Sequence, residues 1–353
     1  MLKVTDQTAL VSLYDSLLLD LDGVLYRGDN PIPHAAEALA AAADQGLRRV
    51  FVTNNASRPP EEVAAQLSGM DIPAEVADVV TSAQAGAALV AEQVPSGSGV
   101  LAVGGPGVSV ALAEVGLIPV STGDAEAGAS VAAVLQGFGK QVSWPDLAQA
   151  AYAVAAGSTW VATNTDSTLP TATGIAPGNG TLVDAVAIAT GTEPEVVGKP
   201  EPPILLQAAA KVDGLKPLVV GDRLNTDILG AANADMASVL VLTGVSGPLE
   251  LWRSPSQMRP QHLIGNLRGL LVPPLVIERS PGSTTCQGTQ AQIVDRRLEV
   301  TVAGVALADI SEPLAPSAVA AAVWAVAHLA WEAGVLPDNA SAVAEALMRR
   351  VRK

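Results

Sequence analysis

The chain has 353 residues, of which 49% are hydrophobic but only 3% aromatic, so its cores must be built from Ala, Val, Leu and Ile. Its formal net charge is −15, almost all of it before Pro273, and a field of that sign repels nucleic acid and anionic membranes. Cys286 is the only cysteine, which excludes an intramolecular disulfide and is typical of a cytoplasmic protein. We therefore expect a cytoplasmic chain with neither a nucleic-acid nor a membrane partner.

Strands and helices alternate through the first part of the chain. The predicted elements are a strand at 16–21, a helix at 33–45, a strand at 49–53, a helix at 60–68, a brief strand at 79–82 and a helix at 83–92. Short apolar runs between helices are typical of strands buried on both faces. The alternation predicts right-handed crossovers and a doubly wound parallel sheet of the Rossmann-like type, in the α/β class.

A Pro/Ser/Gly-rich stretch at 95–99 marks a boundary, after which the rhythm of strands and helices restarts. We interpret residues 97–187 as an inserted α/β cap domain that contains a long polar loop at 164–180. Pro273-Pro274 marks a second boundary, followed by two or three strands and one or two Ala-rich helices. The prediction is a core at 1–96 and 188–272, a cap at 97–187 and a small C-terminal α/β module at 273–353.

Two carboxylates follow the first predicted strand, in the run Asp20-Leu21-Asp22-Gly23. At the carboxyl edge of a parallel sheet, such residues point into the crevice where α/β folds bind ligands. Gly23 permits the sharp turn that brings backbone close to a ligand. The alternative is a solvated turn, which the apolar residues before Asp20 make less favoured.

Two further patterns could hold an anion. Thr53-Asn54-Asn55 follows the second strand, where a hydroxyl and successive N–H groups can form an anion-binding nest. Lys199 lies between Gly198 and Pro200, so its backbone is constrained and its ammonium can be aimed inward. An ordinary polar loop and a surface lysine before a helix are the alternatives.

Asp222 follows a predicted strand at 218–220, and Asp227 lies about one helical turn further on. Mg2+ binds through one or two carboxylates and keeps several waters, so a full protein cage is not needed. The alternative is that Asp222 and Asn225 cap the helix predicted at 225–232.

The order of these four patterns resembles that of the haloacid dehalogenase (HAD) superfamily over residues 12–245. The matches are Asp20/Asp22, Thr53, Lys199 and Asp222/Asp227. The runs Thr53–Asn55 with Ser57-Arg58, Ala162–Asp166, Pro177–Gly180 and Val197–Pro200 resemble the branch with a large C2-type cap. That branch contains nitrophenyl phosphatase-like, pyridoxal phosphate and glycerol phosphate phosphatases. Over its whole length the chain resembles bacterial glycerol 3-phosphate phosphatases.

The resemblance implies a Mg2+-dependent phosphatase that passes through an aspartyl-phosphate. Asp20 would be the nucleophile, and Asp22 the general acid and base. Asp20, Asp222 and the main-chain carbonyl of Asp22 would hold Mg2+, with Mn2+ or Co2+ as substitutes. Asp227 would orient a water on the metal, or else Lys199.

The resemblance also implies which groups hold the phosphoryl oxygens: Thr53, the main-chain amides of Asn54 and Asn55, and Lys199. Asp166 or Asn164 either binds substrate hydroxyls or caps a helix, and the residues leave both readings open. The state of assembly also stays open, with a homo-oligomer as one outcome.

The expected substrate is a small phosphorylated polyol, with glycerol 3-phosphate first. The loop at 164–180 is rich in hydroxyl, amide and carboxylate groups and has no aromatic residue to stack on a ring. Elsewhere the cap has four aromatic residues. Three of them, Trp144, Tyr152 and Trp160, fall in predicted helix or strand and are expected to pack inside the cap. Phe138 is the one that could still stack on a substrate ring. The alternatives are a pyridoxal phosphate or nucleotide phosphatase, a phosphomutase, and a phosphometabolite sensor with the C-terminal module as its output.

Overall fold

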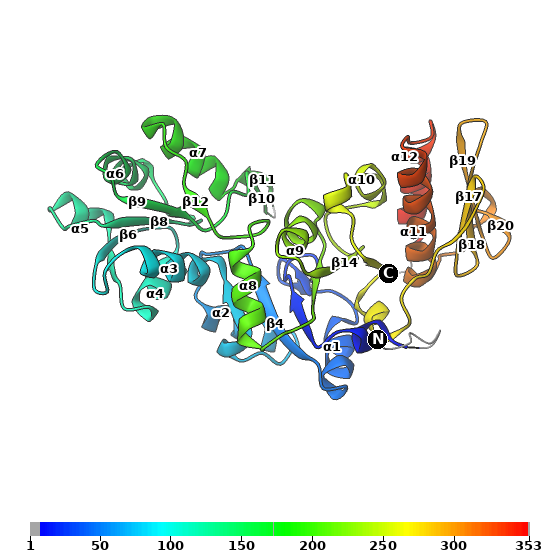
Figure 1. The fold of residues 1–353 in the computed structure, drawn as a ribbon, viewed down its shortest axis with the longest axis horizontal. Coiled ribbons are helices and arrows are strands. Elements are labelled where there is room, and N and C mark those ends of the chain that lie inside the picture. Colours follow the sequence, from blue (N-terminus) through cyan, green and yellow to red (C-terminus); the bar gives the residue numbers. More distant parts are fainter. Residues whose placement is uncertain (1–7, 172, 352–353) are drawn as a thin grey trace. The chain divides into compact units, whose positions relative to one another are not determined.

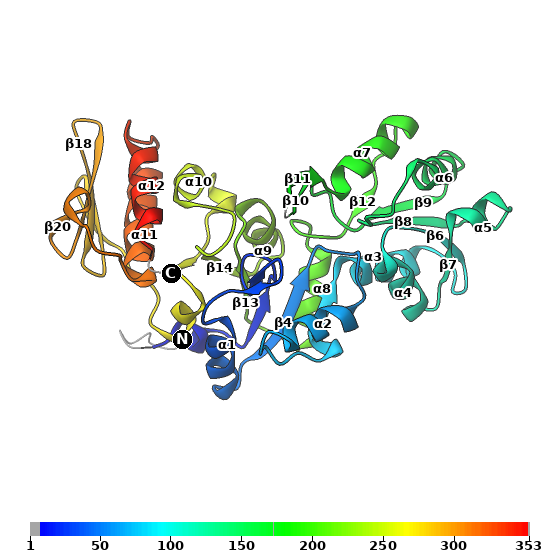
Figure 2. The ribbon, with the colours of Figure 1, turned by 180° about the vertical axis from the view of Figure 1, so that it is seen from behind.

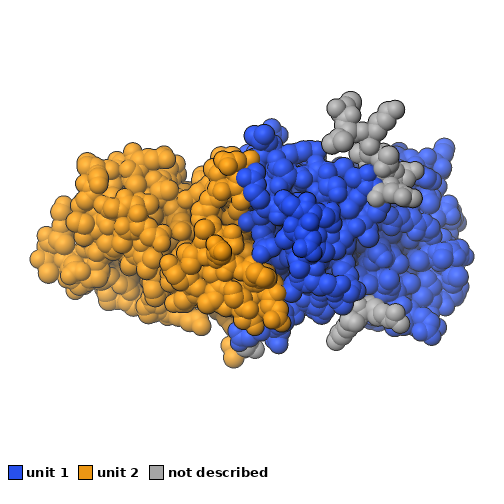
Figure 3. Space-filling model, turned by 90° about the horizontal axis from the view of Figure 1, so that it is seen from below, with its two compact units in different colours: residues 1–49, 214–353 blue, residues 50–213 orange. Residues whose placement is uncertain are grey.

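The structure is a computed structural model that describes residues 8–171 and 173–351 (Figures 1 and 2). Its contacts divide the chain into two compact units (Figure 3). Unit 1 comprises residues 1–49 and 214–353, and unit 2 comprises residues 50–213. Parallel sheets with helices on their connections occur in both units, so the α/β class predicted from the sequence is confirmed.

Four strands of unit 1 lie parallel in the order β15-β14-β13-β1. Their bounds are β1 Ser16–Leu19, β13 Pro217–Gly221, β14 Ala237–Val241 and β15 His262–Ile264. Every residue of β1 and β13 is buried, as expected for apolar runs covered on both faces. Leu19 lies opposite Val220, so the carboxyl ends of these two strands meet at one edge.

The helical segments of unit 1 outside the C-terminal module are short apart from the first. They are α1 (Ala35–Asp44), a π-helical turn (Leu224–Ile228), α9 (Leu229–Asn233), α10 (Pro248–Arg253) and the 3₁₀ helices Leu10–Leu13, Ser256–Met258 and Leu267–Leu271. A small hairpin pairs β2 (Tyr26–Arg27) with β3 (Asn30–Pro31).

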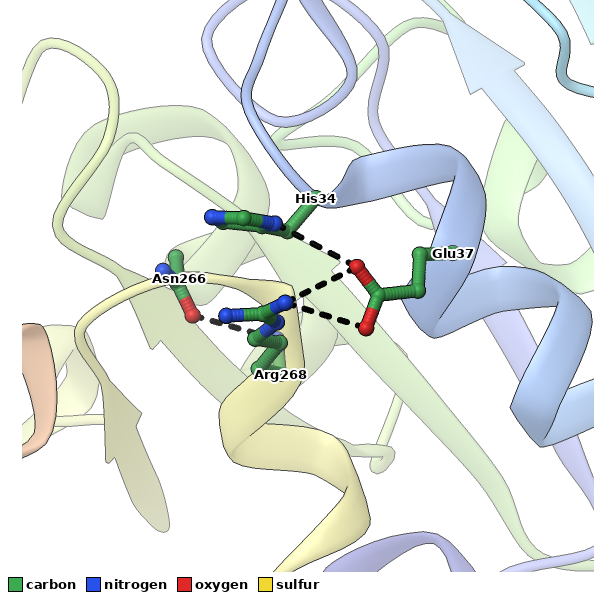
Figure 4. A network of polar contacts seen from close by, with 4 residues as sticks. All are labelled: His34, Glu37, Asn266 and Arg268. Atoms are coloured by element: carbon green, nitrogen blue, oxygen red, sulfur yellow. Dashed lines mark hydrogen bonds and ion pairs between the residues drawn. The ribbon is translucent and has the colours of Figure 1, made fainter. Parts of the chain in front are cut away.

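A surface network joins α1 to the 3₁₀ helix Leu267–Leu271 (Figure 4). Arg268 donates from Nη2 to both carboxylate oxygens of Glu37, at 3.0 and 2.9 Å, and His34 lies 3.3 Å from the same carboxylate. Asn266 caps the 3₁₀ helix through the Arg268 N–H. The Arg268 bonds lower the pKa of Glu37, but the network is exposed and adds little stability.

The C-terminal module is an antiparallel sheet that packs on a long helix. Its strands follow one another in the order β16-β17-β18-β19-β20. Their bounds are Glu278–Ser280, Ser283–Cys286, Thr289–Val294, Arg297–Val302 and Val305–Ala306, followed by a 3₁₀ helix at Leu307–Asp309 and helices α11 (Pro316–Ala333) and α12 (Ala340–Arg349). One face of the sheet packs on α11, whereas the other carries mostly exposed or half-buried polar side chains.

Helix α11 is Ala-rich and buried along most of its length because β17, β18, α10 and α12 surround it. It ends at Gly334, whose φ of +69° provides the left-handed cap. Among the described residues, no helix combines the length and the apolar character that crossing a bilayer requires.

Unit 2 contains a five-stranded parallel sheet in the order β12-β9-β8-β6-β7, and a parallel pair β4–β5. The strands are β4 Arg48–Thr53, which starts in the last residues of the first unit-1 segment, β5 Val79–Thr81, β6 Gly99–Val103, β7 Ile118–Val120, β8 Ala133–Gln136, β9 Thr159–Ala162 and β12 Glu195–Val196. The helices are α2 Pro60–Ser68, the 3₁₀ helix Val76–Asp78, α3 Ser82–Gln93, α4 Pro106–Glu114, α5 Thr122–Glu126, α6 Trp144–Ala155, α7 Asn179–Thr190 and α8 Pro203–Lys211.

Two details of unit 2 differ from the prediction. The polar loop at 164–180 contains an antiparallel hairpin, β10 (Thr168–Thr171) with β11 (Gly174–Pro177), because its β-branched residues can pair across a short connection. Trp144 and Tyr152 do not pack: they are 74% and 60% exposed, since α6 turns its other face to α7 and the sheet. Trp160 is buried and donates its Nε1–H to Gln136.

Candidate active site

Strand β1 delivers Asp20 to the edge of the unit-1 sheet. The Asp20 N–H donates to Val220 O at 2.9 Å and thereby extends the ladder between β1 and β13. Gly23 then turns the chain with a φ of +86°, and its N–H donates to Tyr26 O at 2.8 Å. Asp20 is half-buried and Asp22 is exposed. The two carboxylates therefore differ in environment although only one residue separates them.

Strand β13 delivers Asp222, which is fully buried, to the same edge. The π-helical turn after it brings back Asp227, which is 1% exposed. The Oδ2 atom of Asp227 accepts the N–H groups of Asp222 at 3.2 Å and of Arg223 at 3.1 Å. Asp227 thus fixes the backbone that carries Asp222.

Two glycines pack directly on the Asp222 carboxylate. A Cβ on Gly23 or on Gly244 would overlap its carboxylate carbon and Oδ2, so only glycine fits at either position. The Oδ2 atom also accepts the Val245 N–H at 2.6 Å, and the Asp222 carbonyl accepts the Ser246 N–H at 3.0 Å. The backbone on both sides therefore sets the position of the Asp222 side chain.

Asp20, Asp222 and Asp227 each offer a carboxylate oxygen within 4.8 Å of the others. Three negative groups at this distance repel one another, and two of them are buried, so a cation would relieve the repulsion. An all-oxygen donor set of this kind suits a hard divalent ion such as Mg2+. Asp227 Oδ2 accepts two N–H groups and Asp222 Oδ2 accepts one, and all three carboxylates are candidate ligands.

In unit 2, Thr53 ends β4 and the next two residues leave the sheet. Thr53 is buried, and its Oγ1 accepts the Asn55 N–H at 3.1 Å. The Asn55 side chain instead folds over Ser57, accepting from its N–H at 2.9 Å and its hydroxyl at 2.7 Å. The loop is therefore a compact turn that these three residues stabilise.

Asn54 and Lys199 pair closely, although 145 positions separate them in the sequence. Asn54 Oδ1 accepts the Lys199 N–H at 2.8 Å, and Asn54 Nδ2 donates to Lys199 O at 2.8 Å. The Lys199 side chain is buried, and its Nζ donates to Val52 O at 3.3 Å. Gly198 has no room for a side chain, because a Cβ there would overlap Thr163 O.

The loop after β9 is tied to the same place. Asn164, which is 4% exposed, donates to Asn54 O at 2.7 Å. Asp166 is anchored by its own N–H on Asn164 Oδ1 at 3.1 Å, and its Oδ2 accepts from Asn54 Nδ2 at 3.3 Å. Asn179, at the start of α7, donates to Asn164 O at 2.7 Å. Asn164 therefore links loops to one another. This role differs from substrate binding and from helix capping, the two roles that the sequence left open.

Two polar residues escaped the sequence analysis. Ser82, at the start of α3, donates its hydroxyl to Asn54 O at 2.7 Å, and Asn179 supports the Asn164 loop. A polar residue at the end of a predicted strand was the available signal for Ser82. The run Pro177–Gly180 contained Asn179, but its partner could not be inferred from local spacing.

The glycines of Gly104-Gly105-Pro106-Gly107 have a packing role. A Cβ on Gly105 would overlap the backbone of Ser57, and a Cβ on Gly107 would come within 2.5 Å of Ala56 O and Arg58 O. The start of α4 therefore lies directly on the loop that follows Thr53. This close approach accounts for the Gly-rich run.

The predicted site residues thus form two groups. Unit 1 contains Asp20, Asp22, Asp222 and Asp227, with Asp22 outside the three-carboxylate cluster. Unit 2 contains Thr53, Asn54, Asn55, Asp166 and Lys199, joined by the hydrogen bonds given above. The first group fits a divalent cation. In the second, Lys199 is the cationic residue, and an ammonium is a group that can bind an anion.

Sequence comparison identifies the family. The profile described as haloacid dehalogenase-like hydrolase matches residues 17–118, and a second, HAD-hydrolase-like profile matches residues 196–270. D-glycerol 3-phosphate phosphatase of Mycobacterium tuberculosis is 44% identical over 257 residues, which are 73% of this chain and 71% of that protein. Acid sugar phosphatase of Staphylococcus saprophyticus is 38% identical over 67% of this chain and 90% of its own length.

Comparison with solved structures agrees. The glycerol phosphate phosphatase of Mycobacterium tuberculosis in complex with magnesium is 37% identical, with a TM-score of 0.78 over 97% of this chain and 98% of that one. A thermostable NPPase double mutant of Geobacillus stearothermophilus is 32% identical, with a TM-score of 0.65 over 72% of this chain and 97% of that one. The chain therefore belongs to the haloacid dehalogenase-like hydrolases and is one of the phosphatases of that family.

Proposed function

We propose that this phosphatase hydrolyses a small phosphorylated polyol, with glycerol 3-phosphate first, through an aspartyl-phosphate on Asp20 and with the help of Mg2+. The carboxylate cluster of Asp20, Asp222 and Asp227 is the observation that carries the proposal. Asp20 is the least buried of the three, so it is the one that an incoming phosphate ester can reach.

In the first proposed step, a carboxylate oxygen of Asp20 attacks phosphorus while the bond from phosphorus to the ester oxygen breaks. Asp22 gives its proton to the departing alkoxide, which leaves as the alcohol. In the second step, Asp22 takes a proton from a water that attacks phosphorus. The acyl phosphate bond then breaks, inorganic phosphate leaves and Asp20 is regenerated.

The exposed position of Asp22 suits this exchange, since its proton must pass to a leaving alcohol and come back from water. Asp20, Asp222 and the Asp22 main-chain carbonyl would hold Mg2+, which when bound offsets the repulsion between carboxylate and phosphoryl oxygens. Asp227, through its bonds to the Asp222 and Arg223 N–H groups, keeps the Asp222 loop in place.

We propose that the phosphoryl oxygens of the substrate are bound by Thr53, the main-chain amides of Asn54 and Asn55, and Lys199. The Asn54 bonds support this role for Lys199, because they fix its backbone on both sides of the residue. The Asn55 N–H, which donates to Thr53 Oγ1 here, would have to exchange that partner for a phosphoryl oxygen. Asp166 is the proposed contact to substrate hydroxyls, and its backbone is anchored independently by Asn164.

The choice of a polyol has two supports. The relative that is 44% identical is named a D-glycerol 3-phosphate phosphatase, and the segment 164–180 contains hydroxyls, amides and Asp166 but no aromatic ring. Hydroxyl groups of a polyol can exchange hydrogen bonds with such a surface, whereas a pyridine or nucleobase ring would lack a stacking partner there. The exposed rings of Trp144 and Tyr152 are the feature that counts against this choice.

The test is a comparison of kcat/KM for glycerol 3-phosphate, a sugar phosphate, pyridoxal phosphate and a nucleoside monophosphate, read as released phosphate. We expect glycerol 3-phosphate to lead. A lead of about tenfold by either ring-bearing substrate, equal to about 1.4 kcal/mol of transition-state binding, contradicts the polyol assignment. Phosphate transfer to a second sugar in place of release would instead identify a phosphomutase.

We further propose that the enzyme acts in the cytoplasm and that residues 97–187 form its cap on a core of 1–96 and 188–272. The single cysteine and the net charge of −15 support a reducing compartment and a small-molecule substrate. Limited proteolysis tests the domain proposal: first cuts are expected in the loops nearest its boundaries, at 95–98 and at 191–194 after α7, and a first cut inside β8 or β9 contradicts it.

A further inference from the structure

We propose that the C-terminal module positions the Asp222 loop, acting through α10. The inference rests on the proposed function, in which Asp222 holds Mg2+. It assigns a task to residues 273–353 in the reaction itself: the module keeps the metal ligand in the geometry that binding requires. Three observations within unit 1 carry it, namely the attachment of Asp222 to the start of α10, the bonds between α10 and α11, and a shared core.

The first observation is the attachment. Val245 and Ser246 donate their N–H groups to the Asp222 Oδ2 and carbonyl oxygens, at 2.6 and 3.0 Å. The Ser246 hydroxyl also accepts the Leu224 N–H at 3.1 Å, which ties the segment to the start of the π-helical turn. Helix α10 begins at Pro248, two residues after Ser246. So little chain lies between them that a shift of α10 must move the groups that hold Asp222.

The second observation is a reciprocal pair of indole bonds between α10 and α11. Trp252 of α10 donates its Nε1–H to Val323 O of α11 at 3.0 Å. Trp331 of α11 donates its Nε1–H to Leu251 O of α10 at 3.1 Å. Two bonds of opposite direction fix both the distance between the helices and the rotation of α10. Figure 1 shows α10 beside α11 and α12, which it contacts.

The surroundings make this pairing rigid. Leu251 and Trp252 are 0% and 2% exposed, so the carbonyl and indole groups have no water to replace a lost partner. Trp331 lies edge-on to Trp324, with ring centroids 5.6 Å apart, and the Arg259 guanidinium stacks over it at 4.8 Å. The Trp331 ring is therefore held from more than one side.

The third observation is that the module has no separate core. One apolar cluster contains Leu224 and Ile228 of the turn after Asp222, Leu240 of β14, Trp252 of α10 and most of the buried residues of α11. Because a close-packed interior cannot absorb displacement without opening voids, the position of α11 is transmitted to the turn. The module thus supports the metal loop by packing as well as through the indole bonds.

The test uses Trp252→Phe and Trp331→Phe in the full-length enzyme. Phenylalanine keeps a six-membered aromatic ring and lacks the five-membered ring that carries the indole N–H donor. Mg2+ and Mn2+ affinities are measured on the metal-free protein by calorimetry, and Mg2+ activation by phosphate release. We expect about three- to tenfold weaker metal binding, less than the 10- to 100-fold typical when a direct partner of a ligand is lost. At saturating Mg2+, kcat and the KM for the ester should stay within about twofold of the original values.

Trp324→Phe is the matched control, because Trp324 lies in the same core beside Trp331 but takes part in neither bond to α10. It should lower thermal stability and weaken metal binding less than either test variant does, because it loosens the shared core but keeps both indole bonds. Unchanged metal affinity in both test variants, or an equal loss in Trp324→Phe, overturns the inference. If the single variants do not fold, Arg259→Gln, which removes the cation over Trp331, is measured in the same way with the same expected direction.

Asp222→Asn separates this inference from the function on which it rests. If Asp222→Asn weakens metal binding by about 10-fold or more and the tryptophan variants leave it unchanged, only the task of the module is wrong. If Asp222→Asn also leaves metal binding unchanged, the metal site itself is wrong and the proposed function fails first.

Discussion

The side chain of Asn54 pairs with the main chain of Lys199 as one peptide pairs with another. Its oxygen accepts the Lys199 N–H and its amide donates to the Lys199 carbonyl, both at 2.8 Å. A single amide thereby fixes the backbone on both sides of the only buried lysine among the described residues. The geometry of a cationic group is thus determined by a residue that carries no charge.

Replacing Asn54 by Ala should lower kcat/KM by about 100-fold, the order of loss expected when a charged group moves by about 1 Å. The two bonds to Lys199 and the one to Asp166 would all be lost. The measurement is steady-state kinetics together with thermal unfolding. Gln93→Ala, which removes an exposed side-chain bond to Glu195 in the same unit, is the control and should stay near the original activity. An Asn54→Ala enzyme with an unaltered kcat/KM would show that Lys199 keeps its position without the two hydrogen bonds from the Asn54 side chain.

Replacing Asp20 by Asn should abolish turnover, because an amide cannot attack phosphorus, and the loss should be several orders of magnitude. The readouts are phosphate release and mass spectrometry of acid-quenched enzyme, in which the phosphoryl adduct should disappear. Asp29→Asn, at an exposed position in the same part of the chain, should retain both. Residual activity above about 1% would rule out Asp20 as the nucleophile.

Chelation should stop the enzyme, and Mg2+ should restore it, with Mn2+ or Co2+ as substitutes because octahedral oxygen sites accept them. Asp222→Ala should raise the Mg2+ concentration needed for half activity by about 10-fold or more, since a buried carboxylate ligand is lost. Asp184→Ala, on the exposed face of α7, should leave it unchanged. Identical Mg2+ dependence in the Asp222→Ala enzyme would place the metal elsewhere.

The stability of unit 1 should fall as the pH drops from about 6.5 to about 4, in part because of His262. Burial lowers the pKa of His262 from its usual 6.5 to about 4, and the ring hydrogen-bonds Tyr14 Oη at 2.7 Å. Between those pH values the unfolded chain binds the proton and the folded one does not, so acid favours unfolding. His262→Gln removes this titration and should flatten the decrease in melting temperature between pH 6.5 and 4. His34→Gln, an exposed control, should follow the original curve, and a His262→Gln curve of unchanged slope would contradict the assignment.

Local patterns were sufficient for the parallel strands and for the edge at which polar residues gather. The apolar run before Asp20 and the one before Asp222 each predict a buried strand, and the carboxyl ends of parallel strands meet. That reasoning needs only the nature of nearby residues. The α/β class was predicted correctly on this basis, whereas the phosphatase family was predicted correctly from the resemblance of the four motifs to the haloacid dehalogenase superfamily.

Features that depend on distant partners could not be obtained in this way. Strand β17 (Ser283–Cys286) is short and mostly polar, and it forms because β16 and β18 pair with it on both sides. The hairpin within 164–180 is similar: its composition is that of a loop, and only the pairing reveals two strands. The Asn54–Lys199 pair and the two indole bonds of α10 link positions far apart in sequence, which leave no periodic signal.

Cys286 gives the protein a native reporter of motion in the module. Its thiol lies on β17 beneath α11, is 1% exposed, and has a pKa that burial raises to about 12. At neutral pH the reactive thiolate is therefore scarce, and it is shielded while the β16–β20 sheet packs on α11. Alkylation should then require this sheet to separate from α11. With no other cysteine in the chain, the labelling rate measured by mass spectrometry counts these openings directly, with no engineered probe.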